Sequence, residues 1–492
     1  MLPSSDTSRA SLPMSGEPLY ERLAEHYRRV IVAGTLAPGD RMPSVRAFMS
    51  RHQVSLSTAL QTFRHLEDAG WLLAKPRSGY FVRRPPVARL ATVHEPEIAS
   101  RPNEAQYVGL HERISRVLER AHAYPDVLNL GGATAAAALY PTTRLQTLGV
   151  RLLRHRPTLL TEVGTEGGSP EFRQAVARRA LSSGVTLSID DVMVTSGGVD
   201  AVNLALRAVA QPGDTIAIES PAFFGLLQIL ESLGLRALEI PASPTTGLSL
   251  EALDIALDAY DNVKALVVVP NLQNPLGCIM PDDRKAELVA MCARRGVAII
   301  EDDPYRELIA GDVCARPLKA WDRDGGVIYC PSLNKVLAPG MRLGWMSAGR
   351  WHARVRMLKF AQSRLNESLP QVIAAEFIGS GAFDRHLHQL RERLAIQRDA
   401  MSDAIARYFP SGTRLSPPPG GMLLWIALPD GCDAEKLFEA ALPHGIRIAP
   451  GSIFSNSSRF SGFIRLSCPK PYDQEMEHAL RQLGQLASGL AI

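Results

Sequence analysis

Short apolar segments alternate with helix-like segments between residues 191 and 346, and this alternation constrains the fold more than any other feature of the chain. Buried apolar strands that alternate with helices are typical of a mainly parallel sheet with helices on both faces. We therefore expect an α/β fold built on a large parallel sheet. The predicted strands are 192–194, 215–218, 265–269, 297–300, 327–329 and 342–346, and 282–295 is one of the predicted helices.

The residues that follow these strands carry chemically distinct groups. Ligands of parallel α/β sheets bind beyond the carboxyl ends of the strands, so groups placed there are expected to meet at one edge. The chain supplies a glycine turn, an aromatic side chain, an amide, a carboxylate with a tyrosine, and a serine–lysine pair. They lie in segments 195–198, 220–223, 270–275, 301–305 and 332–335.

This set of groups matches the needs of pyridoxal 5′-phosphate (PLP). The cofactor requires a lysine amine that forms a Schiff base with its aldehyde. A carboxylate keeps its pyridine nitrogen protonated. Its phosphate requires backbone N–H groups at a helix start, together with hydroxyls and an arginine. The ring face accepts an aromatic side chain, and the 3′-oxygen requires donors such as Asn and Tyr. The sequence therefore predicts a PLP site.

Several motifs resemble those of the fold-type I aminotransferases, and they occur in the same order as in that family. The resemblance spans about residues 125–490 and implies a large α/β part with a smaller α+β subdomain. The motifs are N-P-L-G at 274–277, D-D-P-Y at 302–305, S-L-N-K-V-L-A-P-G-M-R-L-G at 332–344, P-G-G-M-L-L-W at 419–425 and F-I-R-L-S at 463–467.

The resemblance implies a role for each matching residue. Lys335 would be the catalytic lysine that forms the Schiff base, and Asp302 would pair with the pyridine nitrogen, with its neighbour Asp303 as the alternative. Phe223 would stack on the ring, with Phe224 as the alternative.

Other matching residues would hold the oxygens of the cofactor. Asn274 and Tyr305 would bind the 3′-oxygen. The phosphate would be held by Ser332, Arg342 and the backbone amides of Gly198 and Val199.

The substrate side of the implied site consists of Arg465 and the Gly131-Gly132 turn. Arg465 would grip an α-carboxylate with a bidentate fork, although a structural ion pair would also explain a buried arginine. Gly132 belongs to the segment that would lie over the substrate. Asn334 replaces a second phosphate-binding serine of many relatives, and Val199 replaces a polar side chain. Each change removes about one hydrogen bond to a charged group, so cofactor binding is still expected.

Residues 18–82 have a separate pattern of helices followed by a hairpin. Apolar residues recur every four positions from 19 to 31 and predict a helix. Ser44 and Ser55 are placed to cap two further helices, and strand-like runs flank the turn at 75–79. This order predicts a winged helix-turn-helix, whose last helix enters the major groove of DNA.

The motif I-x-x-G-x-L-x-P-G-D-R-x-P-S-x-R at 31–46 and the run S-G-Y-F-V at 78–82 resemble the DNA-binding domain of GntR-type bacterial regulators. The resemblance implies double-stranded DNA as a partner. Leu56 stands where members of the family often carry arginine, so neighbouring side chains would supply more of the base readout. The implied DNA-contacting residues are Arg46, Ser55, Ser57, Thr58, Gln61, Lys75 and Arg77.

Charge is distributed unevenly along the chain. The net charge is +4, but residues 1–90 carry +6 and the remainder carries −2. A small basic module on a near-neutral body is typical of a nucleic-acid reader attached to another domain. The proline-rich polar stretch that begins at 83 has no hydrophobic period, which indicates an extended tether. A helical pattern resumes from Gln106 to Ala121.

These observations predict three parts. They are a winged helix-turn-helix DNA-binding domain at 17–84, a linker at 85–104, and an aminotransferase-like PLP-binding domain at 105–492. Within the last part, the large portion is expected at about 150–370 and the small portion at about 105–149 and 371–492.

The remaining sequence features predict a cytoplasmic protein. The six cysteines form no C-x-x-C pair, so reduced thiols of a cytosolic protein are expected. The polar N-terminus lacks a signal peptide's apolar core, and no apolar run approaches the ~20 residues of a membrane span. His386 and His388 have no evident third ligand, so no metal site is predicted.

A winged helix joined by a tether to an aminotransferase-like domain is the architecture of the MocR subfamily of GntR-type regulators. The resemblance implies a PLP-dependent transcription factor that senses an amino acid or amine and acts as a homodimer. One alternative is an active aminotransferase with a fused regulatory winged helix. Another is a sensor whose ligand is PLP itself.

Overall fold

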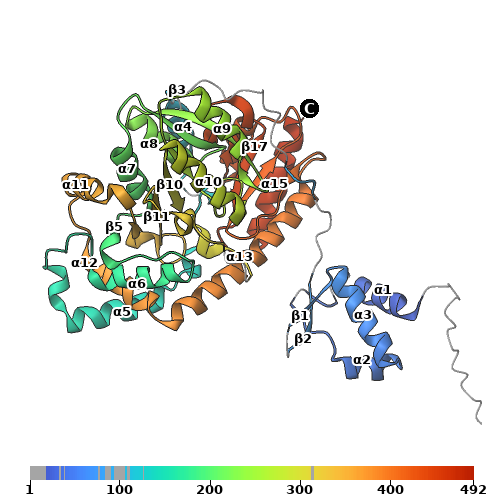
Figure 1. Cartoon of the computed structure of the whole chain (residues 1–492). Helices are drawn as coiled ribbons and strands as arrows, with labels where there is room; N and C mark the ends of the chain where they lie inside the picture. The colour runs from blue at the N-terminus through green and yellow to red at the C-terminus, as the bar shows by residue number, and fades with distance from the viewer. Residues whose placement is uncertain are drawn as a thin grey trace, which may run out of the picture. The chain divides into compact units, whose positions relative to one another are not determined.

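The computed structural model describes residues 18–32, 35–37, 39–75, 78–83, 90–93, 106–107, 111–125, 127–311 and 315–491. The chain divides into two compact units, Met1–Val87 and Ala88–Ile492, which are drawn in Figure 1 and are described separately below.

The first unit is a bundle of three helices followed by a hairpin, as the sequence predicts. Ser44 and Ser55 begin the second and third helices, because each hydroxyl accepts a hydrogen bond from a backbone N–H one turn later. Both donor–acceptor distances, from Ala47 and Thr58, are 3.2 Å. The elements are α1 (Leu19–Val32), α2 (Val45–His52), α3 (Leu56–Asp68), β1 (Leu72–Lys75) and β2 (Gly79–Val82).

One aromatic contact fixes the hairpin of this unit against its third helix. The rings of Phe63 on α3 and Tyr80 on β2 stack with centroids 4.8 Å apart and planes 7° from parallel. Phe63 also packs against the buried ring of Phe48 on α2. The wing and the helix-turn-helix therefore share one apolar core.

A parallel sheet forms the centre of the second unit, as predicted. Its strand order is β11-β10-β9-β6-β7, all parallel. Two bridges, Tyr329 to Ser347 and Ser332 to Gly344, connect β11 to the antiparallel strand β12, which pairs in turn with β5. The strands are β5 (Met193–Thr195), β6 (Thr215–Ser220), β7 (Arg236–Ser243), β9 (Val263–Val268), β10 (Ala298–Asp303), β11 (Val327–Pro331) and β12 (Gly344–Met346).

Helices cover both faces of this sheet, because each strand sends apolar side chains to both sides. One apolar core joins the sheet to α7 (Gly198–Val209) and α8 (Phe224–Ser232). A second core joins the opposite face to α9 (Leu250–Ala259) and α10 (Asp282–Arg295). In Figure 1, β10 and β11 accordingly lie between α7 and α10.

Two parts of the sheet differ from the sequence prediction. Gln106–Tyr107 is not helical but forms strand β3, which pairs antiparallel with β7, and the helix α4 begins only at His111. The apolar residues from 106 onward have a helical period, but the backbone groups of β7 at the edge of the sheet need partners. The sequence prediction also did not include β7 itself.

A second, antiparallel sheet forms the smaller portion of the unit. Its order is β13-β14-β17-β16, and its core is shared with helices α13, α14 and α15. The elements are β13 (Arg414–Leu415), β14 (Leu423–Ala427), β16 (Ala449–Pro450), β17 (Phe463–Ser467), α13 (Gly381–Tyr408), α14 (Ala434–Ala441) and α15 (Gln474–Leu490).

The remaining elements connect the two sheets or pack against their rims. They are α4 (His111–His122), α5 (Thr142–His155), α6 (Pro170–Leu181), α11 (His352–Gln362), α12 (Ser368–Ile378), β4 (Leu128–Asn129), β8 (Gly247–Leu248) and β15 (Ile446–Arg447).

Four described residues of the predicted linker lie against the body. Leu415 on the edge strand β13 donates its N–H to the carbonyl of Ala91 at 3.0 Å. The N–H of Val93 donates to the hydroxyl of Ser416 at 2.9 Å, and the Val93 side chain is buried. The chain is therefore attached to the small sheet well before the second unit's first helix.

The helix α15 offers a matched test of this packing. A Cβ at Gly484 would lie 2.2 Å from the carbonyl oxygen of Tyr408, whereas a Cβ at Gly489 would meet nothing within 4 Å. We expect Gly484→Ala to lower the free energy of unfolding by about 1–3 kcal/mol through overpacking. Gly489→Ala should leave it unchanged or raise it slightly, because alanine favours a helix. Urea unfolding of both variants checks this, and equal stabilities would contradict it.

Candidate functional site

The carboxyl ends of five strands meet at one edge of the large sheet. β6, β9, β10 and β11 are parallel neighbours. β5 points the same way as β11, because β12 is antiparallel to both strands. The sequence-predicted groups of segments 195–198, 220–223, 270–275, 301–305 and 332–335 therefore come together, as expected.

Lys335 lies beyond the end of β11, with its amine largely withdrawn from solvent. Its Nζ donates a hydrogen bond to the backbone carbonyl of Ala133 at 2.6 Å and lies 5.9 Å from the ring centroid of Tyr305. Burial and the positive charge of Arg465 lower the pKa of Lys335 to about 8, although Asp302 opposes this shift. A lysine whose neutral amine is accessible near neutral pH is suited to attack a carbonyl carbon.

Asp302 and Asp303 have different environments, and this separates their roles. The carboxylate of Asp303 is engaged in the structure, because it accepts hydrogen bonds from Arg306 at 2.9 Å and from the hydroxyl of Tyr329 at 2.7 Å. Asp302 instead lines a cavity at the sheet edge. Burial, and then the charge of Asp303, raise the pKa of Asp302 to about 7, and Lys335 lowers it. A desolvated carboxylate of this kind favours a cationic partner.

Asn274 and Tyr305 adjoin each other on the same edge. Both are buried. Burial raises the pKa of Tyr305 to about 12, against the opposing effects of Arg465 and of a hydrogen bond to Asn274. The phenol therefore stays protonated at neutral pH and can donate a hydrogen bond to an acceptor oxygen.

Arg465 is the most buried charged side chain of the site, with 1% of its surface exposed. It comes from β17 of the small sheet, and its Nη1 donates to Asn274 Oδ1 at 2.8 Å. Its Nη2 donates to the carbonyl of Gly131, and its Nε has no partner. No carboxylate of the described chain forms an ion pair with it, so the alternative of a structural ion pair finds no support among those residues. Burial lowers its pKa to about 10, which leaves it charged.

A glycine turn begins α7, and the side chains of Arg342 and Asn334 lie next to it. Gly197 has φ +87°, and a Cβ there would lie 2.8 Å from the amide nitrogen of Asn334. A Cβ at Gly198 would approach Asp302 Oδ1 at 3.4 Å. Arg342 donates to the carbonyl of Ser196 at 3.1 Å, which holds its guanidinium at the same turn. The absence of side chains opens the first backbone N–H groups of α7 to an anion.

Three further residues lie at this turn, namely Ser332, Asn334 and Val199. The hydroxyl of Ser332 accepts the backbone N–H of Asn334 at 3.3 Å. The side-chain oxygen of Asn334 is buried without a partner, and Val199 is half exposed. The chain thus keeps one hydroxyl, one guanidinium and a helix start for a phosphate.

Phe223 and Phe224 point in different directions. Phe223 lines the same cavity as Asp302 and Val199. Phe224 packs edge-on against Phe454 of the small portion, with ring centroids 5.9 Å apart. Phe223 therefore lies beside Asp302 at the sheet edge, while Phe224 is committed to the core.

These residues fit PLP. The unpartnered Arg465 Nε, the open glycine cradle and the desolvated Asp302 carboxyl are the groups that a substrate carboxylate, the phosphate and the pyridine nitrogen would require. When bound, PLP would supply an electron sink that draws electrons from the carbon next to a substrate's amino group.

The segment 131–133 contributes through its backbone, which the sequence did not reveal. The carbonyl of Gly131 accepts from Arg465, and that of Ala133 accepts from Lys335. Gly132 donates its N–H to Asn129 Oδ1 at 2.9 Å. The predicted place of the Gly131-Gly132 turn is consistent with these contacts.

The predicted DNA-contacting residues are distributed over α2, α3 and β1 of the first unit. Arg46, Ser57, Gln61 and Lys75 are exposed. Ser55 is exposed as well, but its hydroxyl is engaged in capping α3 and lies 2.9 Å from both the Ser57 and Thr58 hydroxyls. Thr58 is half-buried. Arg77 lies outside the described residues.

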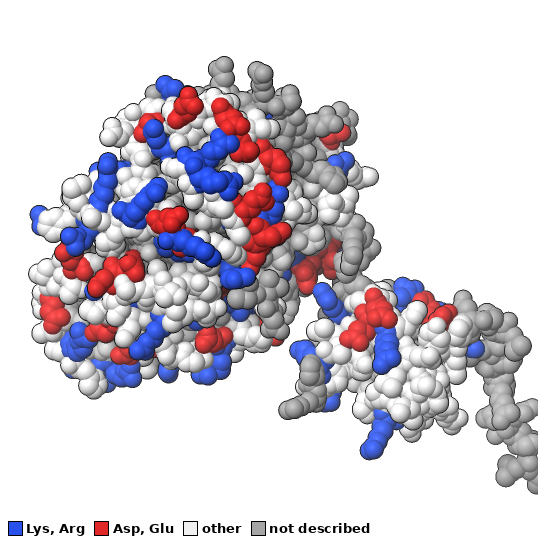
Figure 2. Space-filling model, viewed as in Figure 1, with Lys and Arg blue, Asp and Glu red and all other residues white. Residues whose placement is uncertain are grey.

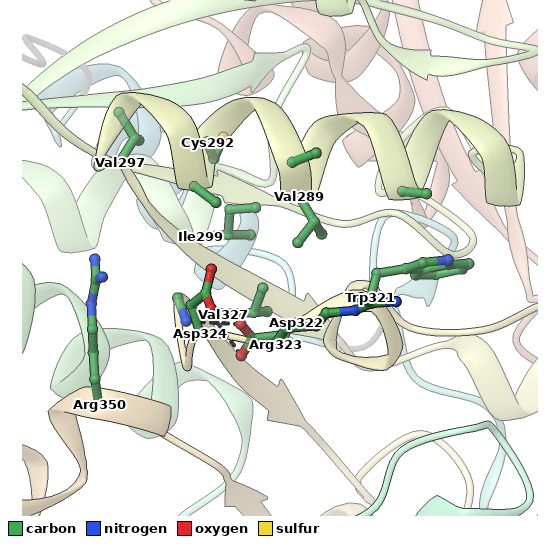
Figure 3. A pocket seen from close by; sticks show the side chains of 14 residues that line it. Val289, Cys292, Val297, Ile299, Trp321, Asp322, Arg323, Asp324, Val327 and Arg350 are labelled. Atoms are coloured by element: carbon green, nitrogen blue, oxygen red, sulfur yellow. Dashed lines mark hydrogen bonds between the residues drawn. The ribbon is translucent and has the colours of Figure 1, made fainter.

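A larger cavity of about 350 Å³ lies elsewhere, at the opposite ends of β10 and β11 (Figure 3). Apolar side chains of α10, including Val289 and Cys292, form one wall of this cavity. Arg350 lies at one end of the cavity and Trp321 at the other. It contains none of the predicted site residues. The sheet edge with Lys335 is therefore the better candidate for chemistry.

The described ranges also show where histidines, cysteines and surface charges lie. No cluster of three metal-ligating side chains is found among the described residues, and His386 contacts the carbonyl of Val336 at 2.7 Å. The five described cysteines are buried and unpaired, while Cys314 is outside the described ranges. No helix in those ranges is long and apolar enough to cross a membrane. On the face shown in Figure 2, acidic and basic side chains of the body intermingle.

Comparison with known proteins divides the chain in the same way. Residues 19–82 match the family "Bacterial regulatory proteins, gntR family", and residues 150–483 match "Aminotransferase class I and II". The HTH-type transcriptional regulator YdcR of Escherichia coli (strain K12), described as uncharacterized, is 36% identical over 95% of this chain and 98% of its own length.

Enzymes match the second unit. A 2-aminoadipate transaminase of Thermus thermophilus is 29% identical over 74% of this chain and 91% of the enzyme. The crystal structure of LysN, the α-aminoadipate aminotransferase of Thermus thermophilus, complexed with N-(5′-phosphopyridoxyl)-L-leucine, has a TM-score of 0.69 and 28% identity. That match covers 77% of this chain and 98% of LysN.

The lowered pKa of Lys335 predicts how the cofactor-free protein takes up PLP. The neutral amine becomes the main form above pH about 8, well below the 10.5 of an ordinary lysine, so the uptake rate should rise through pH 8 and then level off. In Arg465→Gln the midpoint should move upward, because a positive neighbour that favours the neutral amine is removed. Stopped-flow absorbance measures both, and a midpoint near that of an ordinary lysine would contradict the prediction.

Proposed function

The chain belongs to the MocR subfamily of GntR-type regulators, in which a winged helix is fused to an aminotransferase class I and II domain, and from this premise we propose that it regulates transcription in response to an amino acid. The observation that carries the proposal is the buried guanidinium of Arg465, which has no carboxylate partner in the described chain. Burial of a charge without an ion partner is costly, and an anion with the right geometry relieves that cost.

PLP is the cofactor of this domain family, and we assign its contacts to the residues at the sheet edge. Lys335 would hold the cofactor covalently, and Asp302 would face its pyridine nitrogen. Phe223 would cover the ring, and Asn274 with Tyr305 would face the 3′-oxygen. The phosphate would lie at the start of α7, held by Ser332, Arg342 and the amides of Gly198 and Val199.

The effector is proposed to be a small molecule with an amino group and a carboxylate. Its amine would exchange with that of Lys335, and Arg465 would bind its carboxylate through a bidentate fork. The structure of LysN with a phosphopyridoxyl-leucine adduct supports this chemistry in a domain of the same fold. Gly132, in the segment over the site, would limit what the effector carries beyond its α-carbon.

Binding of the effector would change the hydrogen bonds of segment 131–133. The carbonyls of this segment accept hydrogen bonds from Arg465 and Lys335. A carboxylate on Arg465 competes with the carbonyl of Gly131. The segment continues back through β4 to α4, and α4 follows the linker. The effector shifts the protein only if it binds one arrangement of these parts better than the other.

We further propose that the second unit dimerises. Leu160, Val163 and Met357 expose 68%, 86% and 61% of their surface. The segment with Val163 lies beside α11, which carries Met357, because Arg356 on α11 forms an ion pair with Glu166 at 3.3 Å. Exposed apolar surface of this kind favours association. A homodimer presents two winged helices, so its operator should hold two half-sites.

Turnover as an aminotransferase is the second candidate function. The set of Lys335, Asp302 and Arg465 is complete, and transaminases match the second unit. Sustained formation of keto acid at ordinary enzyme rates, ~1–10³ per second, would favour it over the regulator.

The carboxylate role of Arg465 gives a sharp test of the regulator proposal. Arg465→Lys should bind PLP but lose affinity for L-amino acids by about 10- to 100-fold, because a bidentate charged contact is lost. Affinity for the matching primary amines, which lack the carboxylate, should be unchanged. Cofactor absorbance and operator binding during titration with both panels check this.

Two control variants accompany this test. Arg385→Ala, an exposed arginine on α13, should leave both panels unchanged. Lys335→Ala should lose the absorbance band of the bound cofactor and both responses. Equal loss for amino acids and amines in Arg465→Lys would contradict the carboxylate role, and a response to PLP alone would favour a cofactor sensor.

DNA binding should depend steeply on salt, because contacts to phosphates release counterions. Arg46→Ala should reduce the slope of log Kd against log salt by about one, since one phosphate contact is lost. Gln61→Ala should keep the slope and cost about 1–3 kcal/mol at one base position. Fluorescence anisotropy on the upstream DNA measures both, with Arg385→Ala as the control. A flat salt dependence would contradict phosphate binding by the winged helix.

A further inference from the structure

Glu219 is a buried carboxyl that none of the roles above uses. It ends β6 with its neighbour Ser220, and only 3% of its surface is exposed. Its Oε2 accepts the backbone N–H of Val269 at 2.8 Å and lies 3.5 Å from the amide nitrogen of Gln273. Its Oε1 is buried without a partner. A glutamate in this position needs either a proton or a partner.

Glu219 lines a small cavity that it shares with Asp302. The cavity measures about 20 Å³, which is room for one water molecule. Its other walls are apolar and come from α7, α8, β9 and the Phe223 ring. A water in this space has two polar groups within the walls, Glu219 and Asp302, which is the minimum such a water requires.

The surroundings favour a proton on Glu219. Burial raises its pKa to about 8, and the charge of Asp302 acts in the same direction. The other titratable group that faces it is the thiol of Cys278, whose pKa is raised by burial and by Glu219 itself, so that thiol stays neutral. α7 and α8 send only apolar side chains into the cavity. Because Oε2 already accepts a hydrogen bond, Oε1 is the oxygen left to carry that proton.

Asp302 has the complementary need. No hydrogen bond to its side chain is found among the described residues, although its carboxylate must keep one orientation to face a pyridine nitrogen. We propose that Glu219 is a positioning residue for Asp302, whose carboxylate it orients through one water molecule held in the shared cavity. This inference rests on the proposed role of Asp302 toward PLP.

The consequence is a measurable property of the bound cofactor. A firmly held Asp302 carboxylate keeps the pyridine nitrogen protonated, and that positive charge makes the nitrogen joined to Lys335 less basic. Loss of the water bridge weakens Asp302 as a carboxylate. The pH midpoint of the cofactor's absorbance change should then move upward.

Three variants test the bridge by spectrophotometric pH titration of the PLP-loaded full chain. Glu219→Leu removes the donor and should raise the midpoint by about one pH unit. Ala222→Val fills the cavity without altering either carboxyl and should raise it in the same direction, which keeps the test open if Glu219→Leu fails to fold. Glu219→Gln keeps an N–H donor and a neutral side chain and should titrate like the wild type.

The outcomes separate this inference from the proposed cofactor site. If Lys335→Ala keeps the absorbance band, the cofactor site itself is wrong. If that band is lost but both Glu219→Leu and Ala222→Val titrate like the wild type, only the water bridge is wrong. A downward shift in Glu219→Gln would mean that Glu219 is ionised, which also overturns the bridge. A crystal structure of the loaded protein should hold an ordered water between Glu219 and Asp302.

Discussion

The guanidinium of Arg465 joins three parts of the second unit that are far apart in the sequence. It is carried by β17 of the small sheet, and it donates to Asn274 beyond the large sheet and to the carbonyl of Gly131 in the segment over the site. A buried cation tolerates few arrangements of its acceptors, because each unsatisfied donor is costly in a dry environment. The relative placement of these three parts therefore depends on the partners of one side chain.

Burial of the site shifts the pKa values of Lys335 and Asp302 so that both groups favour their neutral forms. Burial lowers the pKa of Lys335 and raises that of Asp302, so each group is brought closer to its neutral form near pH 7. Arg465 keeps its charge and reinforces the shift of Lys335. The edge of the sheet thus holds a reactive amine, a carboxyl ready for a cation and a fixed positive charge within one desolvated region.

Much of this arrangement could be predicted from the sequence. The strand ends were visible because parallel strands are apolar along their whole length, and the polar residue that follows each of them is conspicuous. The start of α7 at Gly198 and the caps at Ser44 and Ser55 follow from local chemistry. Strand β3 was not predictable, because Gln106 and Tyr107 are held by the backbone of β7 rather than by a pattern of their own. The carbonyls of Gly131 and Ala133 carry no side-chain signal at all, and the position of Glu219 beside Asp302 depends on which strands become neighbours.

The contact of Ala91 with β13 also limits the length of free linker between the winged helix and the second unit. Only residues 83–89 separate the end of β2 from Leu90, the first described residue on the body's side. Seven residues span on the order of 25 Å even when fully extended. In a dimer, such a short linker keeps the second winged helix at a high effective concentration near DNA once the first winged helix has bound. The length of the linker would thus limit the spacing of two half-sites that one dimer can bind. Half-sites spaced more widely would lose the avidity, while each winged helix would keep its own affinity for DNA.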